Sequence, residues 1–292
     1  MKTQIFLNDF NWQEISINDT TIFYKGFYNE NKLLEITKSI IKKKTNLELI
    51  AFINKLENNF SIIMKRKNEI YAFSDKIKSF PMLYYKDNFK FLLFENFQLI
   101  KNCKLDLTID KKQILYFSMS GYTISNNTIY KYIKPIKQGT FIHFVKNTVK
   151  EYEYFSFNKK SVKKVSNIKE KLKKINENII LKLIDSCQDK EIVIPLSAGY
   201  DSRFILSGLK KYGYKNISTF SYGRKNNREE KIAKELTNFL KIPWVFIPYT
   251  NKKIKKIKNS KEHQRYEAYA DNLTSIHFPQ DFTAIKYLHD NN

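Results

Sequence analysis

Glycine, cysteine and long hydrophobic runs are scarce in this chain. Its 292 residues include 7 glycines and 2 cysteines. Cys103 and Cys187 are too few and too far apart for a disulfide framework or a four-ligand zinc site, so we expect reduced, buried thiols. No apolar run approaches the length of about 18 residues that a transmembrane helix needs, and polar Asn8, Asp9 and Asn11 interrupt the amino-terminal segment. These absences predict a soluble, cytoplasmic protein without a membrane partner.

Arginine is also scarce, although the formal net charge is +23. Nearly all of the positive charge comes from lysines spread along the whole chain. Lysine lacks the planar guanidinium that makes bidentate contacts to phosphates and bases, so we interpret these lysines as a solvated surface without a specific nucleic-acid site. The lysine-rich run 252–258 is interpreted as the exposed face of a helix. A polyanion-binding protein is the alternative, and charge alone supports it.

The first half of the chain alternates short hydrophobic runs with polar turns. Runs rich in β-branched and aromatic residues are typical of antiparallel hairpins. The predicted strand segments are 60–65, 69–74, 82–85, 89–94, 122–125, 128–133, 140–145 and 149–157. Apolar residues at helical spacing precede them between residues 31 and 57. This half therefore predicts an α+β domain dominated by antiparallel sheets.

In the second half of the chain, the spacing of apolar residues changes. A polar, lysine-rich stretch after Phe157 suits a linker, and an apolar stripe at helical spacing then covers 168–187. Beyond it the sequence predicts strands at 192–196, 217–222 and 244–248, alternating with helices at about 202–212 and 228–240. Such alternation implies right-handed crossovers and an α/β domain in which helices flank a parallel sheet. We therefore predict two domains, 1–158 and 159–292.

The turn between the strand at 192–196 and the next helix carries the clearest chemical signal. In a parallel sheet, ligands bind where a strand ends and the following helix begins. Gly199 can adopt backbone angles forbidden to other residues and lets amides approach an anion, and the helix adds unpaired N–H groups. Ser197 and Ser202 offer hydroxyls to phosphate oxygens, whereas Asp201 would need Mg²⁺ between itself and the phosphate. The pattern predicts a phosphate–magnesium site, with a plain strand-to-helix turn as the alternative.

This Ser-x-Gly-x-Asp-Ser pattern resembles the pyrophosphate loop of the ATP pyrophosphatase superfamily, and residues 196–203 are most similar to the synthetase domain of asparagine synthetase-like enzymes. Ala198 stands where glycine is commoner. Residues 220–223 are similar to the family's second strand, whose end lines the adenine pocket. The resemblance implies an adenine nucleotide alpha hydrolase-like fold, Mg²⁺ at Asp201, and ATP bound by Leu196, Ser197, Ala198, Gly199, Tyr200, Asp201, Ser202 and Ser221. Asn227 and Glu230, in the next helix, are interpreted as an ordinary capping box.

The first half is similar to the glutamine amidotransferase-like domain of the same family. The similarity lies in residues 73–76, 80–85 and 121–139, and it implies an Ntn-hydrolase-like fold. The sequence departs from the family at Lys2, where a cysteine nucleophile with its own α-amine as base is expected. We therefore interpret this domain as degenerate, with a scaffold role.

A second departure follows Gly223, after which the sequence has no glycine. The family carries a further Ser-Gly-x-Gly-x-Asp-Glu turn that completes the nucleotide site. The sequence therefore predicts a synthetase domain that is truncated, degenerate or completed by a second chain. Arg203 and Arg224 follow two strand ends, where they could face phosphates, a substrate carboxylate or solvent.

The resemblance implies ATP-dependent formation of an amide bond, as in asparagine biosynthesis. A small-molecule carboxylate would form an acyl-adenylate, and ammonia or an amine would capture it. Neither a catalytic residue nor an oligomeric state can be assigned from the sequence. The alternative is a catalytically inactive nucleotide-binding or assembly protein that retains the fold. The four histidines, His143, His263, His277 and His289, show no metal-ligand spacing and are interpreted as structural or surface residues.

We predict that the purified chain releases no glutamate from glutamine, because the Lys2 amine cannot form the thioester on which this hydrolysis depends. A coupled glutamate assay with and without ATP, set against a protein-free blank, checks this. The variant Lys2→Cys should stay inactive, because the glutamine-pocket sequences are missing too. Glutamate release above the blank by the unmodified chain would contradict the assignment.

Overall fold

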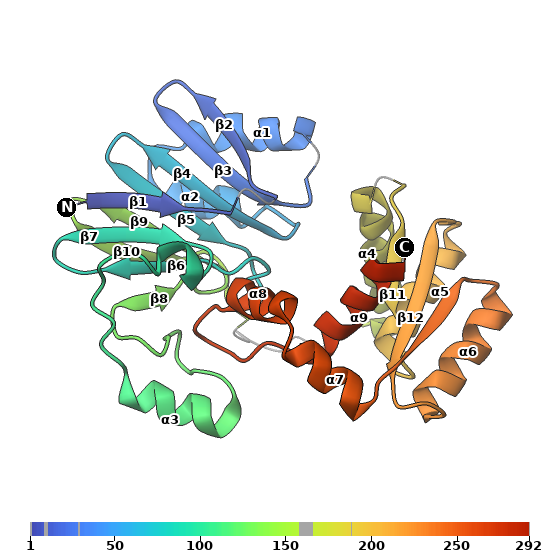
Figure 1. Cartoon of the computed structure of the whole chain (residues 1–292). Helices are drawn as coiled ribbons and strands as arrows, with labels where there is room; N and C mark the ends of the chain where they lie inside the picture. The colour runs from blue at the N-terminus through green and yellow to red at the C-terminus, as the bar shows by residue number, and fades with distance from the viewer. Residues whose placement is uncertain (1, 9–10, 29, 158–165, 188, 292) are drawn as a thin grey trace. The chain divides into compact units, whose positions relative to one another are not determined.

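The computed structural model describes residues 2–8, 11–28, 30–157, 166–187 and 189–291 (Figure 1). The chain divides into two compact units. Unit 1 comprises Met1–Lys159 and Arg265–His277, and unit 2 comprises Lys160–Gln264 and Phe278–Asn292. The segment 265–277, which the sequence placed in the second domain, thus belongs to unit 1. The predicted linker lies largely outside the described residues.

Unit 1 contains two β-sheets. The larger has the strand order β10 (Thr148–Glu153), β9 (Thr140–Val145), β5 (Glu69–Ser74), β4 (Phe60–Arg66), β3 (Thr20–Gly26) and β2 (Gln13–Ile17), all antiparallel. The smaller has the order β1 (Lys2–Phe6), β7 (Lys90–Phe94), β6 (Leu83–Lys86) and β8 (Ile133–Pro135). The predicted antiparallel character is confirmed except at β1, which pairs with β7 in parallel.

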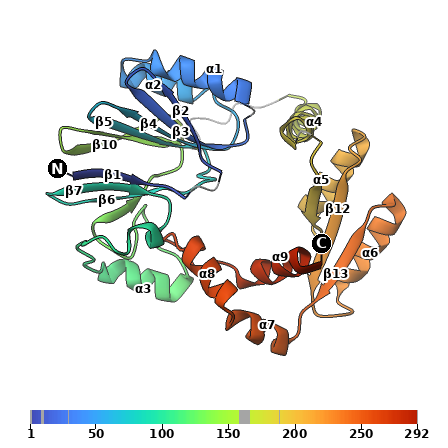
Figure 2. The same ribbon diagram turned by 45° about the horizontal axis from the view of Figure 1, so that its top comes forward.

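The two sheets pack face to face, and helices α1 (Glu30–Ile41) and α2 (Asn46–Ile53) cover the outer face of the larger one (Figure 2). Successive side chains of a strand point to opposite faces of the sheet, so the larger sheet can contribute to a separate core on each face. In β4, Ile62 and Met64 join the helix-side core, whereas Ile63 joins the core between the sheets. The predicted helical spacing within 31–57 is confirmed by α1 and α2.

Two predicted strands, 122–125 and 128–133, are mostly absent. Tyr122 and Tyr130 form isolated bridges only, and regular pairing begins at β8. Ser125 and Asn126 adopt positive φ, which turns the chain between the two segments. The Thr128 hydroxyl donates to the carbonyls of Tyr130 and Ile133, and such local bonds compete with a strand ladder.

A helix that the sequence reading missed, α3 (Lys111–Ser120), precedes this region. Both of its ends have ordinary capping residues. The Asp110 side chain accepts hydrogen bonds from the first turn, and Gly121 ends the helix with φ 80°. Two of the apolar residues of α3, Leu115 and Met119, are exposed, so no periodic buried stripe marked it.

Unit 2 is built on a three-stranded parallel sheet in the order β11 (Ile192–Pro195), β12 (Ile217–Gly223) and β13 (Trp244–Pro248). Its helices are α4 (Ile168–Cys187), α5 (Tyr200–Lys211), α6 (Arg228–Leu240), α7 (Asn251–Lys258), α8 (Lys261–Ala270), which continues into unit 1, and α9 (Pro279–Asn291). One core joins α4, α5 and α6 to the sheet, and another joins α7 and α9 to it. The predicted parallel α/β arrangement of strands and helices is confirmed.

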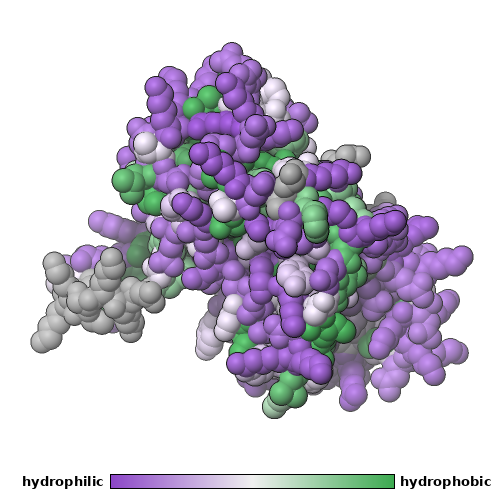
Figure 3. Space-filling view, turned by 90° about the vertical axis from the view of Figure 1, so that its left-hand side faces the viewer, coloured by the Kyte–Doolittle hydropathy of each residue, from purple (hydrophilic) through white to green (hydrophobic). Residues whose placement is uncertain are grey.

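The surface in Figure 3 is covered largely by hydrophilic side chains, with hydrophobic ones in separate patches. Among the described residues, no helix combines the length and hydrophobicity needed to cross a bilayer. Cys103 and Cys187 are free thiols, as predicted, but they are only partly buried.

Gly139 is the glycine of unit 1 whose substitution we expect to cost most. It has φ +65°, and a Cβ built there would lie 2.3 Å from the backbone oxygen of Phe155. In Gly139→Ala, a backbone clash adds to the about 1–2 kcal/mol of left-handed strain. Gly121→Ala is the matched control, because its φ is +80° but the nearest atom is 3.6 Å away. Urea unfolding should show a clearly larger loss of unfolding free energy for Gly139→Ala, and equal losses would contradict this packing.

Candidate functional site at the carboxyl edge of the parallel sheet

The candidate site begins where β11 ends. Leu196 is buried, and its amide donates to the Phe220 carbonyl at 2.7 Å. Its own carbonyl accepts from the Ser221 hydroxyl at 2.6 Å. Both bonds tie Leu196 to the central strand β12, so the chain leaves the sheet at a fixed point and turns into α5.

Ser197 and Ser202 meet across the turn, as the predicted phosphate site requires. Their hydroxyl oxygens lie 3.2 Å apart, and the Ser197 amide donates to the Ser202 hydroxyl at 3.1 Å. The Gly199 amide donates to the Ser197 hydroxyl, also at 3.1 Å. Two of the amides that the sequence assigned to an anion are therefore satisfied by the serines of the turn itself.

Gly199 does not use the backbone freedom that the sequence reading invoked. Its φ is −72° and its ψ 161°, extended values that any residue adopts. The expectation of a special backbone angle was wrong. The structure gives a different reason for glycine: a Cβ at this position would lie 3.1 Å from the Ser197 hydroxyl oxygen. Glycine thus leaves room for the serine contact.

Helix α5 differs from other helices of the chain at its amino terminus. Its N-cap, Gly199, provides no side-chain hydrogen bond. The N-caps of α2, α3, α6 and α7 are Thr45, Asp110, Asn227 and Thr250, and each accepts at least one first-turn amide. Because the first N–H groups of a helix have no partner within it, the amides of Tyr200, Asp201 and Ser202 can donate hydrogen bonds to an outside ligand. The helix dipole favours an anion there.

The remaining residues of the turn are more exposed. Ala198 is half-buried, and the Tyr200 ring is 85% exposed. Asp201 is exposed, and among the described residues its carboxylate has no hydrogen-bond or ion-pair partner. Arg203 folds back, donating from Nε to the Gly199 carbonyl at 3.0 Å while its guanidinium lies 4.8 Å from the Tyr200 ring centroid. The arginine therefore braces the turn.

Ser221 occupies a buried position one strand away, in β12. It is 4% exposed, and besides donating to Leu196 its hydroxyl accepts from Trp244 Nε1 at 3.0 Å. The hydroxyl is therefore occupied within the protein. A nucleotide-binding role for Ser221 stays a prediction, and its observed role is to connect β11, β12 and β13.

The turn after β12 contains the capping pair that the sequence indicated. Asn227 Oδ1 accepts from the Glu230 amide at 2.8 Å, and the Glu230 carboxylate accepts from the Asn226 amide at 2.5 Å. The reciprocal bond thus goes to Asn226 instead of to the N-cap residue. The structural interpretation of Asn227 and Glu230 is confirmed, and Arg224 beside them is exposed.

An aromatic pair at the same edge of the sheet was missed by the sequence reading. The rings of Tyr222 and Tyr249 stack with centroids 5.1 Å apart. The Tyr222 hydroxyl donates to Asp281 at 2.9 Å, and burial together with this bond raises the pKa of Tyr222, so it stays protonated. The signal was available, because Tyr249 directly follows the strand at 244–248. Asp281 carried no such signal, because only the fold brings α9 to this edge.

Residues in the first half of the chain that bear on the resemblance can also be located in the structure. Lys2 lies on β1, exposed, at the position where a cysteine nucleophile would be needed. Asp75 is 2% exposed, and its carboxylate accepts from the amides of Phe60, Ile77 and Ser79. Asp75 therefore holds the turn after β5 and stabilises the fold.

No family model matches the chain, and no curated protein matches it. Solved structures that resemble it include two enzymes. The allosteric regulatory enzyme of purine biosynthesis has 9% identity and a TM-score of 0.31, over 80% of this chain and 61% of that one. Glutamine phosphoribosylpyrophosphate amidotransferase from B. subtilis has 9% identity and a TM-score of 0.27, over 80% of this chain and 72% of that one. The chain thus spans less than two thirds of the first structure.

We predict that Ser221→Ala destabilises unit 2 by about 1–3 kcal/mol, the cost of leaving a buried polar group unpaired. The substitution would remove the hydrogen-bond partner of both the Leu196 carbonyl and the Trp244 indole N–H. Urea unfolding followed by far-ultraviolet circular dichroism measures the loss. Ser207→Ala, on the exposed face of α5, is the control and should change stability little. Equal effects of the two variants would contradict the bridging role.

Proposed function

We propose that the chain is an asparagine synthetase-like, ATP-dependent ligase that joins a small-molecule carboxylate to ammonia or an amine. One observation supports this best. At the carboxyl edge of the parallel sheet, helix α5 begins without a side-chain cap, beside two serine hydroxyls and a carboxylate with no partner among the described residues. Free amides, hydroxyls and an acidic side chain are the groups that a magnesium-bound polyphosphate requires.

The polyphosphate of ATP would bind at the first turn of α5. Its oxygens would accept from the amides of Tyr200, Asp201 and Ser202. The hydroxyls of Ser197 and Ser202, now 3.2 Å apart, would turn from each other toward the phosphate. Exchanging one hydrogen bond for another costs little, whereas the charged acceptor makes the new bonds stronger.

The carboxylate of Asp201 is suited to bind Mg²⁺. Mg²⁺ in nucleotide sites is held by one or two carboxylates together with phosphate oxygens and water. The Asp201 carboxylate is exposed and stands in the first turn of α5, within the same turn as the amides. The ion would offset the repulsion between this carboxylate and the phosphates.

The reaction proposed is adenylation followed by amide formation. A carboxylate oxygen of the substrate attacks the α-phosphorus of ATP, the bond from that phosphorus to the bridging oxygen breaks, and pyrophosphate leaves. Ammonia or an amine then attacks the acyl carbon, the nitrogen releases a proton to water, and AMP departs with the electron pair of the broken C–O bond. The amides of the α5 turn would stabilise the charge that develops on pyrophosphate. The catalytic side chains remain unassigned.

A second candidate is a nucleotide-binding or assembly protein without turnover. It is favoured by the serine contacts that satisfy the Ser197 and Gly199 amides and by the Arg203 bond to the Gly199 carbonyl, because such a turn is stable without ligand. Both candidates share ATP binding at α5, and they differ in chemistry.

Asp201→Asn should weaken Mg²⁺-dependent ATP binding about tenfold to hundredfold, the range for losing one charge-assisted contact. Isothermal titration with ATP in the presence and absence of Mg²⁺ measures it. Glu229→Gln is a matched control, because Glu229 is an exposed acid at the equivalent second position of α6. Equal ATP affinities for Asp201→Asn and the unmodified chain would refute the site.

Exchange of labelled pyrophosphate into ATP separates the two candidates in the same preparation. The ligase should exchange label in the presence of a suitable carboxylate, and exchange should fall in Asp201→Asn but not in Glu229→Gln. ATP binding without exchange across a panel of carboxylates would favour the second candidate.

A further inference from the structure

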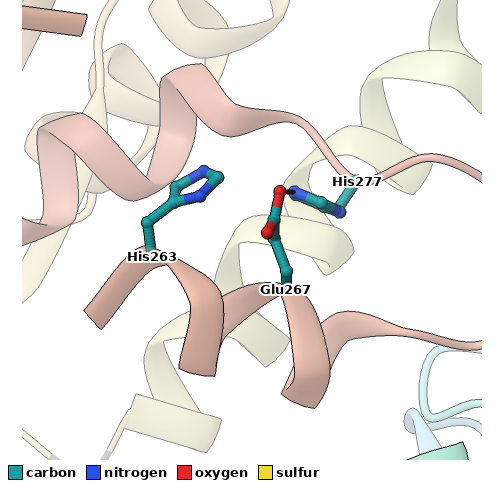
Figure 4. Close-up of side chains that lie close together, drawn as sticks. All are labelled: His263, Glu267 and His277. Carbon is teal, nitrogen blue, oxygen red and sulfur yellow. Dashed lines mark ion pairs between the residues drawn. The ribbon is translucent and has the colours of Figure 1, made fainter. Parts of the chain in front are cut away.

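His263, Glu267 and His277 gather in one stretch of chain. One ligand atom from each lies within 4.8 Å of the others, and Figure 4 shows the two imidazoles on either side of the carboxylate. Glu267 Oε1 and His277 Nε2 lie 3.6 Å apart. The sequence reading interpreted both histidines as structural or surface residues and did not foresee that they lie close to one carboxylate.

Helix geometry explains the first half of the cluster. His263 and Glu267 stand four residues apart on α8, so their side chains project from the same face on successive turns. The His263 amide is anchored by a hydrogen bond from its N–H to the Ser260 hydroxyl at 3.1 Å. The residue is 1% exposed, and its ring packs edge-to-face on Phe282 with centroids 5.3 Å apart.

The third ligand is brought back by the segment that follows α8. Leu273 is buried in unit 1, Thr123 donates from its amide to the Thr274 carbonyl at 2.8 Å, and Ile276 donates to the Gly121 carbonyl at 2.9 Å. His277 comes directly after these contacts, so its backbone is held. Its ring stands perpendicular to that of Tyr266.

Two imidazoles and one carboxylate suit zinc and other divalent transition metals, whereas Mg²⁺ and Ca²⁺ require oxygen ligands. Ligand atoms around a tetrahedral Zn²⁺ with bonds near 2.1 Å lie about 3.4 Å apart. The Glu267–His277 separation of 3.6 Å is already close to this value. The ligand atom of His263 lies within 4.8 Å of the other two and would have to move closer to them when an ion binds.

Partial burial suits a site that an ion can enter. The Glu267 side chain is 41% exposed and that of His277 22% exposed. His263 is buried, so solvent reaches the cluster through Glu267 and His277. Three protein ligands with a fourth position for water is the arrangement of many zinc centres.

We propose that His263, Glu267 and His277 form a binding site for a divalent transition metal ion of the zinc class. The site is separate from the Mg²⁺ position proposed at Asp201, uses different ligand chemistry, and does not depend on the proposed ligase activity. A bound ion would fix α8 to the segment 271–277, and it would raise the stability of the folded chain because it binds only the assembled ligands.

Titration of the metal-stripped full chain with Co²⁺ tests the site. Tetrahedral coordination should give saturable visible absorption at one equivalent, Zn²⁺ should abolish it, and millimolar Mg²⁺ should leave it unchanged. Glu267→Gln and His277→Gln should each weaken binding by more than the 10–100-fold that loss of an outer-shell partner costs. Both residues are partly exposed, so these variants avoid the buried His263.

His289→Gln is the control, because that histidine is largely exposed and outside the cluster. It should bind Co²⁺ like the unmodified chain. Zn²⁺ should also raise the melting temperature of the unmodified chain and of His289→Gln, but not of Glu267→Gln. Absence of the visible band, or equal affinity in all variants, would show an ordinary Glu267–His277 ion pair and overturn the proposal.

Discussion

The geometry of the parallel-sheet unit depends on the hydrogen bond from the Ser221 hydroxyl to the Leu196 carbonyl. This bond, with the Leu196 amide on Phe220 and the Trp244 indole on Ser221, fixes the end of β11 against the central strand. A chain that leaves the sheet at a fixed point delivers the next helix to a fixed place. The serine contact and the first turn of α5, which has no side-chain cap, follow directly after this point in the chain.

Regular elements with a buried face could be predicted from the sequence. The strands β12 and β13 and the helix α6 lie within about one residue of their predicted bounds, because burial imposed a clear period on each. Helix α4 also has its predicted bounds, although Ile168, Leu172 and Ile175 of its apolar stripe are exposed. Periodicity gave a wrong strand at 128–133, because the Thr128 side chain there competes with the backbone for hydrogen bonds. Periodicity also could not reveal α3, whose start and end are marked only by the capping residues Asp110 and Gly121. Nor could it show that the segment 265–277 belongs to unit 1.

The candidate site was predictable in position but not in detail. The order of strand, small residues and helix located the turn, and in the fold the hydroxyls of Ser197 and Ser202 contact each other. The backbone angle of Gly199 and the occupied hydroxyl of Ser221 depend on neighbours that no local pattern specifies. The cluster of His263, Glu267 and His277 had one local signal, the four-residue spacing on α8. Its third member is placed by contacts to residues 121 and 123, far away in sequence.

The central claim is that the first amides of α5 bind a polyphosphate. Nuclear magnetic resonance of selectively labelled protein tests it directly, by following the backbone amides of Tyr200, Asp201 and Ser202 during titration with pyrophosphate and Mg²⁺. We expect saturable shifts of these three amides, with those of the lysine-rich helix α7 unchanged. Shifts confined to α7 and other lysine-rich surfaces, with α5 unaffected, would contradict the claim and identify the binding as nonspecific charge attraction.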